Sequence, residues 1–326
     1  MSEIRFDAAD VADVRFVTSP LWETIFSLRA IADPGRHAVH LPWVREVREL
    51  PVTDHLELLK AFAYPGRWLP DFLTPTPPGP IGKFADEIAE VRRTPPATVI
   101  ADLDATAVRR PLDREGAALR ADPAGRLDAL CDAVEVWHDA TIAPYWSRMR
   151  SVLDADIAYR SRQLATGGAR LLFDTLHPTV RWAGDRLIAD DPWDLDVDLR
   201  GRGLPLMPSI FVDRRVIWPL RDDWPPMAAY PARAVATLWE RRPASPFASR
   251  ALGGVLGTAR ARLIIELQAP ATTTELAQRL EVSTATISGH LSALLAAGLV
   301  TRSRHGRTVL YLDTAVASAL LEANGL

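Results

Sequence analysis

Two sets of polar side chains lie close together near the carboxyl end of the chain. The first set combines small hydroxyl-bearing residues with a glycine and a histidine: Thr284, Thr286, Ser288, Gly289, His290 and Ser292. The second set is basic and falls within six positions: Arg302, Arg304, His305 and Arg307. Hydroxyl groups can donate to or accept from base edges, and guanidinium groups pair well with phosphates. These residue types therefore favour noncovalent recognition of duplex DNA.

A helix is needed to present the first set on one face. Ser283 is a favourable N-cap, and Gly298 suits the left-handed position that follows a last helical turn. Apolar residues fall at helical spacing on one side, namely Ile287, Leu291, Leu294 and Leu295. Exposed helix faces usually carry charged residues, whereas this one carries small side chains and can approach a partner closely. We predict a recognition helix over 283–297; the alternative is a partly buried helix whose small residues serve packing.

The neighbouring segments complete the plan of a winged helix-turn-helix. Thr272 and Glu275 form the Thr-x-x-Glu pattern of a capping box, which opens a short helix before the predicted recognition helix. Two apolar strands around a glycine predict a hairpin over 299–312, the wing, which carries the basic set. One longer helix is predicted over 252–267. Two helices at a tight turn followed by a basic hairpin are typical of this DNA-binding motif; a merely solvated hairpin is the alternative for the arginines.

Three short motifs occur in order in this module: Ser-x-His-Leu at 288–291, Ala-Gly-Leu-Val at 297–300 and Gly-Arg-x-x-x-Tyr at 306–311. Together they resemble the ArsR-type winged helix-turn-helix transcriptional regulators. The resemblance implies that the first set and the arginines of the wing contact DNA. This sequence departs from the family pattern at Gly289, a position where members of the family often carry a polar side chain. The resemblance also implies a homodimer formed by the first and last helices of the module, where six apolar residues could pair: Leu263, Ile264, Leu267, Val316, Leu320 and Leu321.

The preceding part of the chain predicts a mainly helical body with an antiparallel β-meander. After Gly167 the pattern changes to short alternating or apolar pieces that predict strands, at 179–183, 186–188, 195–199, 208–212 and 215–218. A further helix is predicted over 230–240. Segments 208–212 and 230–233 resemble an uncharacterised domain that precedes this module in a group of actinobacterial regulators, which carries no known activity.

The length of the chain and the distribution of its charge both predict two domains. A chain of 326 residues predicts two or three domains, and we place a body at 1–245 and the winged helix-turn-helix domain at 246–326. The net charge is −3, but from Ala248 onward seven arginines and no lysine stand against five acids, a net charge of +2. A mildly basic module on an acidic body is typical of a DNA-binding domain attached to another domain. The fold class is therefore α+β, mainly α.

The remaining residues that could form a metal or catalytic site are better explained as structural residues. Cys131 is the single cysteine, which excludes an internal disulfide and a thiolate metal cluster within one chain. Cys131, Glu135 and His138 share a helix face, and His37 and His40 are three apart, but such sets are common without a metal. The acids Asp194, Asp196 and Asp198 share a strand face that usually faces water. No phosphate loop or hydrolase motif occurs, so we expect no enzyme, no catalytic residue, no metal and no cofactor.

The start of the chain lacks a signal-peptide pattern, and no run approaches the roughly 18 apolar residues of a membrane span. We therefore expect a cytoplasmic protein without a membrane partner. The function expected from the sequence is a homodimeric regulator of transcription, a repressor by family habit, that binds double-stranded operator DNA and answers to a small-molecule effector held by the body. The alternative is an enzyme or a protein-interaction protein whose winged helix serves only dimerisation or partner contact.

Overall fold

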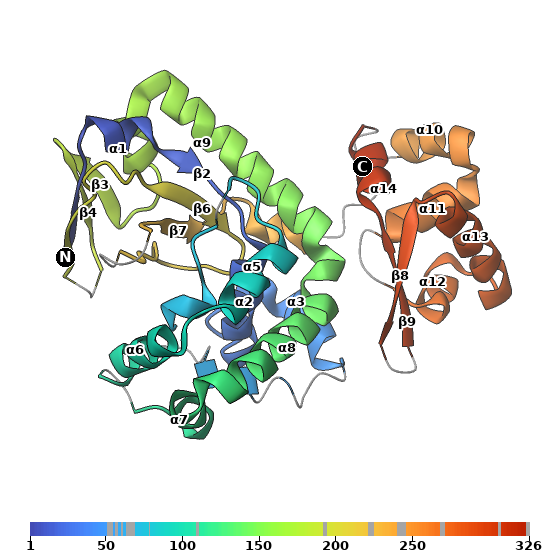
Figure 1. Cartoon of the computed structure of the whole chain (residues 1–326). Helices are drawn as coiled ribbons and strands as arrows, with labels where there is room; N and C mark the ends of the chain where they lie inside the picture. Colours follow the sequence, from blue (N-terminus) through green and yellow to red (C-terminus); the bar gives the residue numbers. More distant parts are fainter. Residues whose placement is uncertain are drawn as a thin grey trace.

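The structure is a computed structural model of a mainly helical α+β chain (Figure 1). It describes residues 1–50, 55, 58–59, 61–62, 69–77, 79–108, 111–191, 194–220, 225–239, 246–267, 271–305 and 308–323. Within these ranges, no helix is both long enough and apolar enough to cross a membrane.

Helices form most of the body, with short strands near both of its ends. The α-helices are α1 (Ala8–Ala12), α2 (Pro20–Ala32), α3 (Leu41–Arg48), α5 (Phe84–Arg92), α6 (Pro96–Ala107), α7 (Arg114–Ala121), α8 (Pro123–Thr141) and α9 (Trp146–Asp174). Short 3-10 helices are η1 (Ala38–His40), η2 (Asp71–Leu73), η3 (Ala143–Tyr145) and η4 (Val235–Leu238). The strands are β1 (Ser2–Arg5), β2 (Arg15–Phe16), β3 (Val180–Ala183), β4 (Arg186–Ala189), β5 (Asp196–Asp198), β6 (Pro205–Ser209) and β7 (Ala228–Pro231).

The strands do not form the predicted antiparallel meander. Among the described residues of the body, only β3 and β4 are consecutive strands that pair antiparallel. Strand β1 pairs antiparallel with β4 and parallel with β5, which gives the order β3-β4-β1-β5. The second sheet, β2-β6-β7, is parallel throughout. The meander prediction was wrong because it paired strands that are neighbours in the sequence. In the structure each sheet of the body also contains a strand from the first 16 residues, β1 in one and β2 in the other. Tyr230, predicted in a helix, lies instead in β7, because the backbone there pairs with β6, with Tyr230 opposite Pro208.

A buried carboxyl group joins the helical part of the body to the second sheet. Glu23 on α2 is 1% exposed. Its oxygens accept hydrogen bonds from the amides of Ile210 (2.9 Å) and Phe211 (3.2 Å) and from the hydroxyl of Ser209 (3.1 Å), at the end of β6. Burial raises the pKa of Glu23 to about 7, although these three donors favour its ionised form.

We predict that this carboxyl group makes the protein less stable as the pH rises from about 4.5 to about 7. The folded state then keeps a proton that the unfolded chain releases, so the free energy of unfolding falls, by about 3 kcal/mol in total. The loss is complete above the folded-state pKa. Urea unfolding between pH 5.5 and 8 should show this slope in the wild type and a smaller slope in Glu23→Gln. Equal slopes in the two proteins would contradict the assignment.

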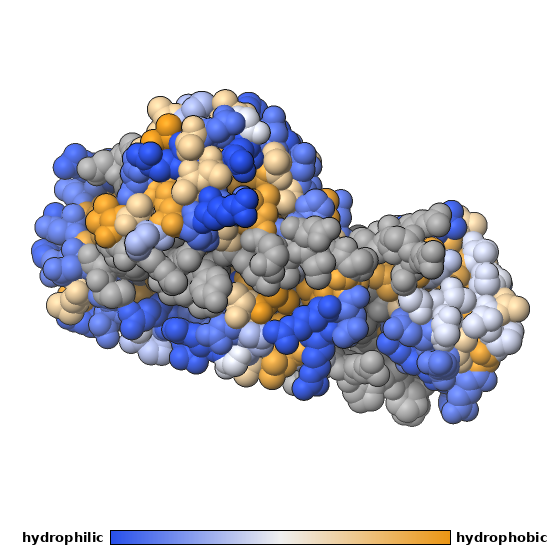
Figure 2. Space-filling view, turned by 90° about the horizontal axis from the view of Figure 1, so that it is seen from below, coloured by the Kyte–Doolittle hydropathy of each residue, from blue (hydrophilic) through white to orange (hydrophobic). Residues whose placement is uncertain are grey.

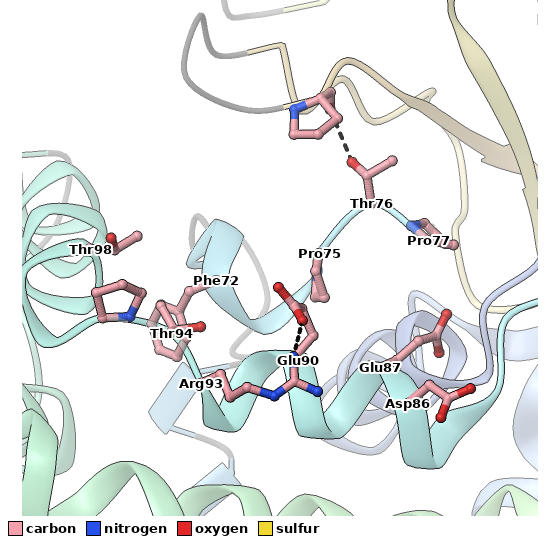
Figure 3. A pocket seen from close by; sticks show the side chains of 12 residues that line it. Phe72, Pro75, Thr76, Pro77, Asp86, Glu87, Glu90, Arg93, Thr94 and Thr98 are labelled. Carbon is pink, nitrogen blue, oxygen red and sulfur yellow. Dashed lines mark hydrogen bonds and ion pairs between the residues drawn. The ribbon is translucent and has the colours of Figure 1, made fainter. Parts of the chain in front are cut away.

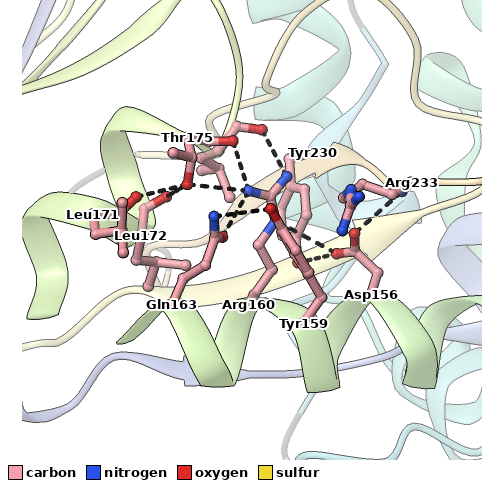
Figure 4. A network of polar contacts seen from close by, with 10 residues as sticks. Asp156, Tyr159, Arg160, Gln163, Leu171, Leu172, Thr175, Tyr230 and Arg233 are labelled. Atoms are coloured by element: carbon pink, nitrogen blue, oxygen red, sulfur yellow. Dashed lines mark hydrogen bonds and ion pairs between the residues drawn. The ribbon is translucent and has the colours of Figure 1, made fainter. Parts of the chain in front are cut away.

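A second buried network fastens α9 to β7 (Figure 4). Asp156 accepts a hydrogen bond from the hydroxyl of Tyr230 (2.8 Å) and from the amide of Arg233 (3.2 Å). Arg160 lies one helical turn further on and donates to the carbonyls of Thr175 (2.6 Å) and Leu176 (3.2 Å), which follow α9. The helix α9 bends at Gly168, which takes a non-helical φ of 64°. Asp156 fastens the part of α9 before this bend to β7, and Arg160 fastens the same part to the residues that follow α9.

Removing one hydroxyl group tests this network. Tyr230→Phe leaves a buried carboxyl oxygen without its donor, so we expect a loss of about 1–3 kcal/mol in the free energy of unfolding. The matched control is Tyr159→Phe, because the half-buried Tyr159 hydroxyl only accepts a 3.3 Å contact from Gln163. Chemical unfolding of both variants measures the difference. A Tyr230→Phe variant as stable as the control would show that the network contributes little.

The carboxyl-terminal part has an apolar core of its own. Its elements are α10 (Pro246–Leu256), α11 (Thr258–Glu266), α12 (Thr273–Leu280), α13 (Thr284–Ala296), β8 (Val300–His305), β9 (Thr308–Asp313) and α14 (Ala315–Ala323). The single helix predicted over 252–267 is two helices, because Gly257 takes a φ of 84° and turns the chain between them. The helix α14 packs against α9 of the body, where the hydroxyls of Ser147 and Ser318 lie 2.9 Å apart.

Candidate nucleic-acid interface

A capped helix and a left-handed turn set the angle of the two central helices. The hydroxyl of Thr272 accepts from the Glu275 amide (3.2 Å), and the Glu275 carboxylate accepts from the Thr272 amide (2.7 Å), so the predicted capping box is present. Glu281 ends α12 with a φ of 56°. This left-handed residue turns the chain within two positions, and α13 can begin at once.

The helix α13 has the cap and the apolar face predicted for it. Ser283 accepts a hydrogen bond from the Thr286 amide (3.1 Å), and three residues at helical spacing are buried: Ile287, Leu291 and Leu294. The opposite face is exposed and uncharged. Figure 2 shows pale, near-neutral residues gathered at this module's end of the molecule. A helix that carries no charge on its exposed face loses little hydration when another surface approaches it.

The first set of predicted residues lies together on or beside this face. Thr284, Thr286, Ser288, Gly289 and Ser292 are exposed, and His290 is half-buried. Two hydroxyls already have partners: Thr286 contacts the Ser283 hydroxyl (2.8 Å), and Ser292 donates to the Ser288 carbonyl (2.9 Å). Within the described residues, the side chains of Thr284 and Ser288 have no such bond. They are therefore the hydroxyls best placed to bind a partner.

One basic residue that the sequence did not single out lies beside the exposed face of α13. Arg262 on α11 is exposed and lines a small hollow of about 60 Å³ together with Thr286 and His290. Its place beside α13 depends on the packing of α11 against α13, which sequence spacing does not disclose. Arg262 thus adds a guanidinium group at the edge of the exposed face.

The second set follows on an antiparallel hairpin. Strands β8 and β9 pair from Val300 opposite Asp313 to His305 opposite Thr308. Arg302 stands opposite Tyr311 and is exposed. The backbone of Arg304 and His305 belongs to β8, but their side chains lie outside the described atoms, and Arg307 lies outside the described residues. Their contacts with DNA remain predictions.

Most of the apolar residues predicted to pair two copies are in the core instead. Leu263, Ile264, Leu267 and Leu321 are each 1% exposed or less and pack within the module. The mistaken inference has a simple cause, since an amphipathic pattern shows that a face is covered but not what covers it. Leu320 is half-buried, and Val316, which is 64% exposed, is the most accessible member of the set for contact with a second copy.

The other candidate residues hold the body together. The thiol of Cys131 is buried, and burial raises its pKa to about 12. His138 contacts the Thr24 hydroxyl (2.8 Å) and stacks on Phe84, while Glu135 pairs with Arg92 (3.3 Å). His40 contacts the indole nitrogen of Trp239 (3.2 Å). Across the described part of the chain, no group of three or more such residues could hold a metal ion.

The comparison with known families falls on this interface. Residues 263–302 match the model of the bacterial regulatory protein, arsR family. The match runs from α11 through α12 and α13 into β8, so it covers the capped turn and the exposed face. No curated protein and no solved structure matches the chain. The ArsR-type helix-turn-helix domain indicates DNA-binding regulation of transcription. The resemblance of segments 208–212 and 230–233 has no support from these comparisons.

Two glycines should respond oppositely to the same substitution: Gly289, inside α13, and Gly298, which follows the C-cap of that helix. A Cβ at Gly289 would meet no atom within 4 Å, so Gly289→Ala should stabilise the helix by roughly 0.5–1 kcal/mol. Gly298 ends the helix with a φ of 69°, so Gly298→Ala should cost about 1–2 kcal/mol. Urea unfolding measures both. Destabilisation by Gly289→Ala would show that the position is not open.

Proposed function

We propose that this chain is a DNA-binding transcriptional regulator that places α13 in the major groove of operator DNA. The observation that carries the proposal is the exposed, uncharged face of α13. A face lined by Thr284, Ser288 and Gly289 can approach base edges closely, and two of its hydroxyls are available to bond with them. The match of residues 263–302 to the arsR family supports the same role.

The basic residues around this face supply the attraction to phosphates. Arg302 on β8 and Arg262 on α11 are exposed on elements that pack against α13, and we propose that both contact the DNA backbone. Arg304, His305 and Arg307 extend this set along the hairpin, which acts as the wing. Because Gly289 offers no side chain to read a base, the shape of the DNA carries a larger share of the specificity, and phosphate contacts carry a larger share of the affinity.

We further propose that the regulator acts as a homodimer on a palindromic site and represses transcription until a small molecule binds the body. The body at 1–245 and the DNA-binding domain at 246–326 then have separate tasks, and neither is catalytic. The contact between α9 and α14, where the hydroxyls of Ser147 and Ser318 lie 2.9 Å apart, supports this division because it links the body to the domain. A change in the body can reach the DNA-binding domain there.

The arginines of the hairpin provide the test. In filter-binding titrations against the DNA upstream of the chain's own gene, Arg302→Ala should weaken binding and reduce the slope of log K against log salt by about 0.9. The double variant Arg304→Ala with Arg307→Ala should reduce it by about 1.8. A variant that lacks one phosphate contact releases about one counterion fewer from the DNA when it binds, so its binding depends less steeply on salt.

The matched control is Arg114→Ala, which removes the same charge from a body side chain that is 95% exposed. It should leave the slope unchanged. If the wing variants behave like this control, the hairpin does not contact DNA. If no DNA is bound while the chain still forms dimers, the winged helix serves assembly, and the regulator proposal fails.

A further inference from the structure

An arginine of α2 lacks an acceptor for its charged group. The Arg29 guanidinium lies over the Phe26 ring, 4.7 Å from its centroid. It makes no hydrogen bond or ion pair with any residue that the structure describes. The side chain is half-buried, so solvent reaches part of it, yet burial lowers its pKa to about 10. A desolvated guanidinium without an acceptor is costly, and an oxyanion would supply the missing acceptor atoms.

The carboxylate nearest in charge, Asp213, is engaged elsewhere. It stabilises the Arg29 cation only from a distance, while its Oδ2 pairs with Nε of Arg214 (3.5 Å) and lies 3.7 Å from Nδ1 of the buried His37. The Arg215 amide donates to the Asp213 carbonyl (2.6 Å), and Arg214 takes a φ of 58°. Such a backbone is costly outside glycine and is often retained near ligand sites. This turn keeps Asp213 beside His37 and leaves Arg29 unpaired.

The surrounding charges favour an anion with one negative charge. Arg36, exposed on the turn after α2, adds a second positive charge near Arg29. Asp33 and Asp213 also act on this cluster, and they would repel a second negative charge on a ligand. Burial lowers the pKa of His37, so its ring is neutral at neutral pH and takes no part in this balance.

The cluster lies where parallel sheets often bind ligands. The loop that carries Asp213 follows the carboxyl end of β6, the central strand of the parallel sheet. Ligands of such sheets bind beyond the carboxyl ends of the strands. A planar guanidinium matches the two oxygens of a carboxylate. We propose that Arg29 and Arg36 bind the carboxylate of a small organic acid here, with Arg29 as the bidentate partner.

The body has a second place where a small molecule could bind. An open groove of about 460 Å³ lies between α5 and α6 (Figure 3). Its arginine, Arg93, already pairs with Glu90, and Asp86 and Glu87 add negative charge. An organic anion is therefore disfavoured in this groove, which serves as the control site of the experiment.

A short series of contacts links the cluster to the DNA-binding domain. His37 precedes η1, which packs against η4. The carbonyl of Leu238 in η4 accepts a hydrogen bond from Arg148 on α9, and the preceding residue, Ser147, contacts Ser318 of α14. The acid is therefore an effector of the proposed regulator, a consequence that rests on the proposed function; the binding itself does not.

Calorimetric titration of the full chain at about pH 7.5 tests the binding. Benzoate should bind with a Kd of about 1 mM or tighter, and benzamide, its neutral analogue of similar shape, at least about tenfold more weakly. Inorganic phosphate, mainly a dianion at this pH, should bind more weakly than benzoate. Equal affinity for benzoate and benzamide, or tighter binding of phosphate, would overturn the proposal.

Single substitutions locate the carboxylate. Arg29→Gln should lower the affinity for benzoate about tenfold or more, and Arg36→Gln about two- to threefold. Arg114→Gln, the same change on an exposed residue of α7, should have no effect. Thr98→Trp fills the groove of Figure 3 and should leave benzoate binding unchanged. Unchanged binding in Arg29→Gln, or loss of binding in Thr98→Trp, would contradict the site.

Circular dichroism checks that Arg29→Gln is folded. If it is not, Arg29→Lys takes its place; this variant keeps the charge but lacks the planar fork, so the affinity should fall about fivefold. Benzoate binding without DNA binding would uphold the site and reject the regulator, and DNA binding without benzoate binding would do the reverse.

Discussion

The body depends on one buried carboxyl group. Glu23 lies on α2, in which eleven residues are buried, and accepts three hydrogen bonds from the end of β6: one from the Ser209 hydroxyl and two from the next two backbone amides. Apolar packing alone would let the helices slide over the sheet, since it has no direction. Three hydrogen bonds to one carboxyl group fix the contact at a single register. Asp156 on α9 repeats this device one strand further along, where it binds Tyr230 of β7, so β6 and β7 are each tied to a helix by a buried acid.

The DNA-binding domain could be predicted in detail because its signals are local. Thr272 with Glu275, and Ser283 with Thr286, act over three residues, and a reader of the sequence sees both partners at once. The helix predicted over 283–297 is α13 with its cap, and the hairpin follows where the wing was predicted. The hydrogen bonds that Thr286 and Ser292 make within the helix could not be predicted. A hydroxyl group can bond either to its own helix or to a ligand, and the residue type does not show which.

The body was less predictable because its pairings are distant. Sequence patterns at 179–218 indicated strands, yet nothing in them showed that Ser2–Arg5 would enter between β4 and β5. Glu23 and Ser209 are likewise 186 residues apart. An acid in a mostly apolar helix is a signal that some partner exists, but which residue is the partner depends on the tertiary structure. The same limit hid the place of Arg262 beside α13.

The junction between α9 and α14 decides what an effector could do. Asp313 accepts a hydrogen bond from Ser318 (2.6 Å), whose hydroxyl also contacts Ser147 of α9, and burial raises the pKa of Asp313. Arg148, next on α9, partly opposes that rise. A ligand shifts such a contact only by binding one arrangement of the two parts more tightly than another. In the proposed regulator, α9 is the element best placed to transmit an effector's influence, because Asp156 fastens it to β7 and its first turn contacts α14. An effector would then change the position of α13 relative to the body, and the exposed face of α13 would keep its shape.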